Sequence, residues 1–210
     1  PQRPSLVAAI SRDLDRIVIS SLGGLLVSGN IVSKSDWDHD AVLKFFRDLS
    51  ETLKVPPESI LIVPGNHDFY RQNEDPERFE TINYQHEMSY RGFISEFQGA
   101  KPLHEINQVA KISIKSLPYN IVIGLLNSAR WTSVPGFFEY GFVGKEKYRS
   151  ILDGMQSIKG APSLRMMVLH HHLVPIQPFE RPGMNPARPI SVTLDAVEIT
   201  RDAQEAGISL

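Results

Sequence analysis

Apolar residues recur along the first third of the chain with two spacings, one typical of helices and one typical of strands. Helical spacing predicts an amphipathic helix from Ser5 to Arg16 and a second helix that Asp36 can cap. Short apolar runs predict strands at residues 17–19, 25–27 and 60–63. Helices that alternate with strands in this order are typical of an α/β protein.

The remaining sequence continues this alternation. Residues 117–119 contain a proline and separate two strand-like runs, which we expect to be neighbours in one sheet. The last predicted helix can be capped by Ser191 or Thr193. The predicted elements are a helix at 79–97, strands at 109–114 and 120–126, a helix at 145–155, a strand at 165–169 and a helix that ends near Ala206.

Composition fits one globular domain over residues 1–210. Hydrophobic residues make up 41% and charged residues 22% of the chain, and the formal net charge is −2. Lysine and arginine are scattered, which argues against a nucleic-acid groove. The absence of cysteine, of a signal peptide and of an apolar run of about 20 residues predicts a cytoplasmic protein without a membrane partner. The oligomeric state stays open.

Three of the predicted strands end on polar clusters. These clusters are Gly29-Asn30, Gly65-Asn66-His67-Asp68 and His170-His171-His172. Sites in α/β sheets lie beyond the carboxyl ends of strands, so we expect the clusters to converge. Without cysteine, any metal must be held by imidazole and oxygen ligands, which suit Mn, Fe or Zn.

These motifs resemble the calcineurin-like metallophosphoesterases, including the cyclic-nucleotide phosphodiesterase-like bacterial members. The likeness rests on Gly65-Asn66-His67-Asp68 after a strand and on Leu169-His170-His171-His172 after a later one, followed by Pro175 and a helix. It implies an α/β/β/α sandwich with mixed sheets and a centre of two divalent metal ions. It also implies hydrolysis of a phosphate di- or monoester by a metal-bound hydroxide.

The resemblance assigns roles to individual residues. Asn66 and His170 would be metal ligands, His67 the general acid and Asp68 the group that orients His67. Asn30 stands where the family has an aspartate that bridges the two ions. Only one of three successive histidines is expected to be the ligand, because their side chains cannot all face one site. His171 and Asn127 are candidates for contact with the substrate.

Part of the family pattern is missing from these 210 residues. No Asp-x-His block precedes the first helix, and no Gly-His-x-His block follows Ile208. We therefore expect the chain to be a piece of a longer protein, incomplete at both ends and without the first and last strands. The missing ligands, and Asn30 in place of aspartate, argue against activity of this chain by itself. The alternative is a degenerate, non-catalytic module that acts by binding proteins.

Overall fold

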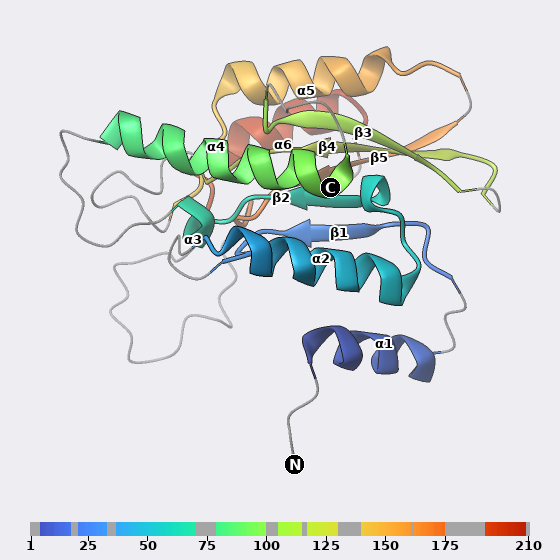
Figure 1. The fold of residues 1–210 in the computed structure, drawn as a ribbon. Helices are drawn as coiled ribbons and strands as arrows, with labels where there is room; N and C mark the ends of the chain where they lie inside the picture. The colour runs from blue at the N-terminus through green and yellow to red at the C-terminus, as the bar shows by residue number, and fades with distance from the viewer. Residues whose placement is uncertain are drawn as a thin grey trace, which may run out of the picture.

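The computed structural model describes residues 5–17, 21–32, 37–69, 79–99, 105–114, 117–129, 140–160, 162–174 and 192–208, without the side chains of 79–86. It is a mixed α/β structure (Figure 1). The described helices are α1 (Leu6–Arg16), α2 (His39–Leu53), α3 (Asn66–Phe69), α4 (Phe79–Gln98), α5 (Lys145–Ser157) and α6 (Ala196–Glu205), with a 3₁₀ turn at Pro57–Ser59. The strands are β1 (Leu25–Ser28), β2 (Ile60–Val63), β3 (Gln108–Ser113), β4 (Asn120–Leu125) and β5 (Ser163–Val168).

The strands form two small sheets. In the first, β1 runs parallel to β2, with Leu25 beside Ile60. The second has the order β3-β4-β5, in which β3 and β4 are antiparallel and β4 and β5 are parallel. The predicted strand pair around residues 117–119 is therefore confirmed.

Apolar clusters hold helices on the outer faces and the two sheets together in the middle. Phe46 of α2 and Phe93 of α4 pack with Ile62 of β2 in one cluster. Tyr148 of α5 and Ile199 of α6 pack with β4 in another. Between the sheets lies a third cluster, formed by Leu61, Val63, Ile123 and Leu125 with partly buried neighbours. Burial of these side chains is the main force that keeps the layers together.

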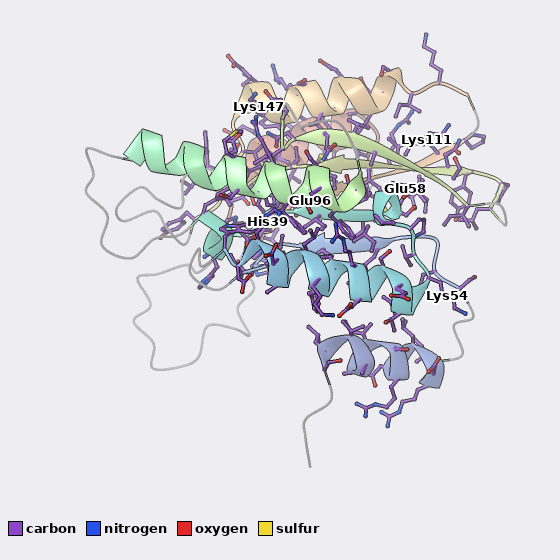
Figure 2. All side chains as sticks on the ribbon, viewed as in Figure 1. His39, Lys54, Glu58, Glu96, Lys111 and Lys147 are labelled. Atoms are coloured by element: carbon purple, nitrogen blue, oxygen red, sulfur yellow. The ribbon has the colours of Figure 1, made fainter. Side chains whose placement is uncertain are left out.

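Helix α4 also covers the edge of β2. Tyr90 Oη donates a hydrogen bond to the Ile62 carbonyl at 2.8 Å, and Gln98 Nε2 donates to the Ile60 carbonyl at 3.0 Å. On the surface, His39 of α2 lies 2.9 Å from Glu96 of α4 (Figure 2). Two carbonyls of β2 thus accept hydrogen bonds from side chains of α4 instead of from another strand.

Three local predictions need correction. Asp38 caps α2 by accepting from the Ala41 N–H at 3.0 Å, whereas Asp36 lies outside the described residues. Asp195 occupies the position before α6, and Thr193 instead joins a backbone bridge to Gly141. Ile17 ends α1, and the rest of the strand predicted at 17–19 lies outside the described residues. Short polar residues compete for caps, so spacing alone does not choose among them.

Candidate functional site

The ends of β1, β2 and β5 meet, although they belong to two different sheets. Gly29 follows β1 and Gly65 follows β2, and the two glycines lie against each other. A Cβ added to Gly29 would lie 2.5 Å from Gly65 N and 2.8 Å from His170 Nδ1. The clusters therefore converge from two sheets instead of from one edge of a single sheet, because the third cluster follows a strand of the second sheet. The convergence itself is present.

His170 connects the two sheets at this point. Its Nδ1 lies within hydrogen-bonding distance of the Ser28 carbonyl, and its Nε2 lies 3.1 Å from Asn66 Oδ1. A carbonyl can only accept, so Nδ1 carries the proton and Nε2 presents a lone pair. Burial lowers the pKa of His170, and the neighbouring His172 and His67 lower it further against the opposing effect of the Ser28 bond. The ring is therefore neutral at neutral pH, as a metal ligand must be.

Asn66, His67 and Asp68 lie in one helical turn that follows β2. This turn is α3, and His67 is partly exposed on it. Asn30 Oδ1 accepts a hydrogen bond from the His67 backbone N–H at 3.1 Å. Asn30 itself has φ of 55°, a left-handed conformation that asparagine tolerates better than most residues. The Asn30 amide therefore shapes the turn that carries Asn66 and His67.

Asp68 is fully buried and binds backbone groups. Its Oδ1 accepts from the Val32 N–H at 3.0 Å and its Oδ2 from the Gly65 N–H at 2.7 Å. Burial raises the pKa of Asp68 to about 6, while the N–H groups of Gly65 and of Asn30–Val32 oppose this shift. Through these bonds the Asp68 carboxylate links the loop after β1 to the turn after β2. The role that the resemblance implies for it, orienting His67, stays a prediction.

A second set of contacts surrounds the ends of β4 and β5. Parallel backbone bridges join Ala129 to Phe142, Gly141 to Thr193 and His172 to Val192. Asn127 is buried in this region, where its Oδ1 accepts from the Ala129 N–H at 2.9 Å. The amide of Asn127 therefore closes a local turn, which argues against the substrate contact proposed for it.

The His171 ring packs edge-to-face against that of His170, with the ring centroids 4.9 Å apart, and His171 is only 2% exposed. Ser128 Oγ accepts from the His171 backbone N–H at 3.2 Å and lies 2.8 Å from His171 Nδ1, to which its hydroxyl can donate. His171 Nε2 is buried without a hydrogen-bond partner among the described residues. Burial, followed by the neighbouring His170 and His172, lowers the pKa of His171 to about 3.

The three successive histidines thus occupy three environments. His170 faces Asn66, His171 is buried against Ser128, and His172 is exposed. The prediction that they cannot share one site is confirmed. The burial of His171 argues against direct contact with a substrate and makes it a support for the backbone beside His170. Ser128 was missed by the sequence reasoning, because a serine after a strand gives no signal of its own.

The donor atoms that converge here fit one divalent ion better than two. His170 Nε2 and Asn66 Oδ1 are acceptors 3.1 Å apart, close to the spacing of about 3 Å between adjacent ligands around an ion with bonds of about 2.1 Å. Among the described residues no group of three or more His, Asp or Glu is placed to hold a metal. Two neighbouring dications repel each other, and the described part of the chain places no free carboxylate at this point to offset that repulsion.

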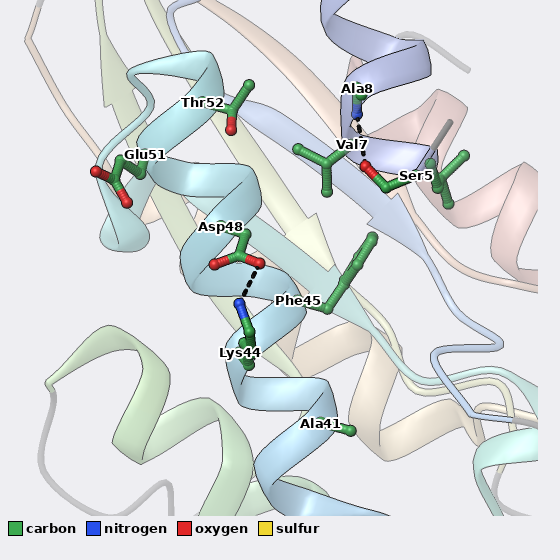
Figure 3. Close-up of a pocket in the computed structure, with 10 residues that line it drawn as sticks. Ser5, Val7, Ala8, Ala41, Lys44, Phe45, Asp48, Glu51 and Thr52 are labelled. Carbon is green, nitrogen blue, oxygen red and sulfur yellow. Dashed lines mark hydrogen bonds and ion pairs between the residues drawn. The ribbon is translucent and has the colours of Figure 1, made fainter. Parts of the chain in front are cut away.

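A groove of about 540 Å³ lies elsewhere, between the first turn of α1 and the outer face of α2 (Figure 3). Its walls include Leu6, Val7 and Phe45, with the ion pair of Lys44 and Asp48 at 2.7 Å beside them. None of Asn30, Asn66, His67 or His170 lines it. The groove therefore has no part in the chemistry of the strand ends.

Comparison of the chain with known proteins returned neither a matching family model nor a matching curated sequence. Among the described helices, none has both the length and the apolar character required to span a bilayer.

Proposed function

We propose that this chain is the core of a metal-dependent phosphoesterase, and that its sheets and outer helices form the phosphoesterase-type α/β/β/α sandwich. The observation that carries the proposal is the pair formed by His170 Nε2 and Asn66 Oδ1. With the Asn66 amide as it lies, both atoms are acceptors and no proton joins them. A cation bound by both atoms is the natural partner for such a pair.

His170 and Asn66 would hold the ion, with Asn30 beside them. Divalent ions in such enzymes activate a water molecule and neutralise phosphate charge. His67, partly exposed on the same turn as Asn66, is the residue that we assign to protonate the leaving oxygen of a phosphate ester. Further ligands, above all carboxylates, must come from outside the described residues for a complete two-ion centre.

A second candidate function is a degenerate module that binds proteins and has no activity. One observation favours it: Asn30 Oδ1 already accepts a hydrogen bond from His67 N–H, and an amide brings no negative charge to a metal. In this alternative the phosphoesterase fold persists without catalysis.

Metal binding by the full-length protein separates the two candidates. We expect Mn²⁺ to bind, as measured by titration calorimetry, and His170→Ala and Asn66→Ala each to weaken binding at least about tenfold, as loss of a ligand should do. His39→Ala is the matched control, because His39 pairs with Glu96 on the helical surface. Unchanged affinity in His170→Ala and Asn66→Ala would contradict the proposed site.

Activity is tested on bis-p-nitrophenyl phosphate with Mn²⁺ supplied. Asn30→Asp keeps an oxygen for the His67 N–H and adds the missing charge, so we expect this variant to hydrolyse the ester faster than the parent. Adding His67→Ala should then lower the rate by roughly 10²–10⁴, the usual contribution of a general acid. No turnover by Asn30→Asp with bound metal would favour the non-catalytic module.

A further inference from the structure

The loop after β1 and the turn after β2 are joined by reciprocal hydrogen bonds from side chain to backbone. Asn30 of the first loop accepts from the His67 N–H of the second, at 3.1 Å. Asp68 of the second accepts from the Val32 N–H of the first, at 3.0 Å. Each side chain thus binds the backbone of the opposite segment, so neither segment can shift without breaking a bond made by the other. We call these two hydrogen bonds the loop clasp.

Asn30 acts as the N-terminal cap of α3 from outside the helix. The residue before α3 is Gly65, which has no side chain, and Asn30 Oδ1 accepts from the N–H of the second helical residue in its place. A Cβ on Gly65 would lie 2.4 Å from Asn30 Oδ1 and 2.4 Å from Asn30 N. Glycine at position 65 therefore leaves the space that the asparagine occupies.

Asp68 completes the cap from inside the helix. Its second oxygen accepts from the Gly65 N–H at 2.7 Å, as the third residue of a capping box does. Trp37 Nε1 also donates to the Asp68 backbone carbonyl at 3.1 Å, which ties the turn to the start of α2. The positive φ values of Gly29 and Asn30 turn the N–H groups of the first loop toward the carboxylate.

From these contacts we propose that Asn30 and Asp68 are positioning residues, whose clasp holds Ser28, Asn66 and His170 in the ligand-ready arrangement before any metal binds. Ser28 fixes the His170 tautomer, and Asn66 supplies the oxygen that faces Nε2. The end of β1 and the turn after β2 must therefore both be correctly placed around the same imidazole ring. Opening the clasp would free the Ser28 carbonyl from His170. The importance of the clasp for metal affinity rests on the proposed function, but its effect on His170 does not.

The test reads the His170 tautomer in metal-free protein by ¹⁵N NMR of the imidazole rings, at about pH 8 where histidine is neutral. We expect the parent chain to show His170 protonated at Nδ1. Asn30→Ala and Asp68→Asn should give a mixture of tautomers, whereas Asn30→Asp, which keeps the accepting oxygen, should keep the parent spectrum.

Asp195→Asn is the matched control for a buried carboxylate. Asp195 accepts from the Val143 and Gly144 N–H groups at 3.2 and 2.7 Å, in the same manner as Asp68 but in the other half of the molecule. Its variant should lose stability and leave the His170 spectrum unchanged. Unchanged His170 signals in Asp68→Asn or Asn30→Ala, below their melting temperatures, would overturn the proposal, as would an equal change in Asp195→Asn.

Mn²⁺ titration of the same variants then separates the clasp from the function. If the parent binds Mn²⁺, Asp68→Asn should bind it at least about tenfold more weakly, and Asp195→Asn should not. If the parent binds no Mn²⁺, the proposed function fails, while altered tautomers in Asp68→Asn still establish the clasp.

Discussion

The two halves of the site are held together by different means. On the first sheet, the segments after β1 and β2 are joined through side chains, namely Asn30 and Asp68, that bind backbone N–H groups. On the second sheet, the segments after β4 and β5 are joined through the Asp195 carboxylate and, in addition, through backbone bridges such as Gly141 to Thr193. A side-chain bond is lost when its residue is replaced, whereas a backbone bond is kept in every substitution other than one to proline. The first half should therefore be more sensitive to mutation and the second more robust.

The largest effect is expected from acid acting on the second half. The pKa of His171 is lowered to about 3 from 6.5. Between these pH values His171 is therefore protonated in the unfolded chain and neutral in the folded chain. Stability should fall as the pH drops from about 6.5 toward about 3, by up to about 5 kcal/mol. His171→Asn keeps an acceptor for Ser128 and cannot titrate, so urea unfolding of this variant should show a weaker loss. An identical pH profile would mean that other groups cause the acid sensitivity.

Gly65→Ala should be the most damaging single substitution in the first half. The added Cβ meets Asn30 N at 2.4 Å, and backbone atoms cannot move aside cheaply. We expect a loss of about 4 kcal/mol in the free energy of unfolding. Gly92→Ala is the control: nothing lies within 4 Å of its Cβ position on α4, so the variant should be more stable by about 0.5–1 kcal/mol. Similar losses in both variants would show that the close contact between the segments after β1 and β2 does not contribute to stability.

Asp68 should give a pH dependence of the opposite sign to that of His171. Its pKa is raised to about 6 from 3.8, so between these values the folded chain binds more protons than the unfolded one. Its contribution to stability is then present at low pH and lost as the pH rises through about 6, with a total near about 3 kcal/mol. The unfolding free energy of the parent minus that of Asp68→Asn should therefore decrease as the pH rises across this window. A rising difference would contradict the burial argument.

The smallest effect is expected from Thr193→Val in the second half. Its hydroxyl donates to the His171 carbonyl over a long 3.4 Å, whereas the Thr193 backbone N–H donates to the His172 carbonyl at 2.8 Å and is kept in the variant. We expect a loss below about 1 kcal/mol by urea unfolding. A loss as large as that of Gly65→Ala would remove the contrast between the two halves.

Local patterns in the sequence were enough to predict most helices and strands, and the residues that end the strands. The apolar runs at 60–63 and 120–126 became buried strands, and the helical spacing from Ser5 to Arg16 became α1. These predictions succeeded because the spacing of apolar residues already records which face of each element is buried. The convergence of Asn66 and His170 was also predicted from their places at strand ends, although the two strands belong to different sheets.

Only the tertiary structure decided how the polar side chains are used. In the sequence Asp68 adjoins His67, yet its carboxylate binds the backbone of Val32, and Asn30 caps a helix that begins at Asn66. His170 and His171 are identical in type and adjacent, yet His170 lies between the Ser28 carbonyl and the Asn66 amide, whereas His171 is buried against the Ser128 hydroxyl. Hydrogen-bond partners far apart in the chain carry no periodic signal, so such roles exist only after the two sheets have packed together.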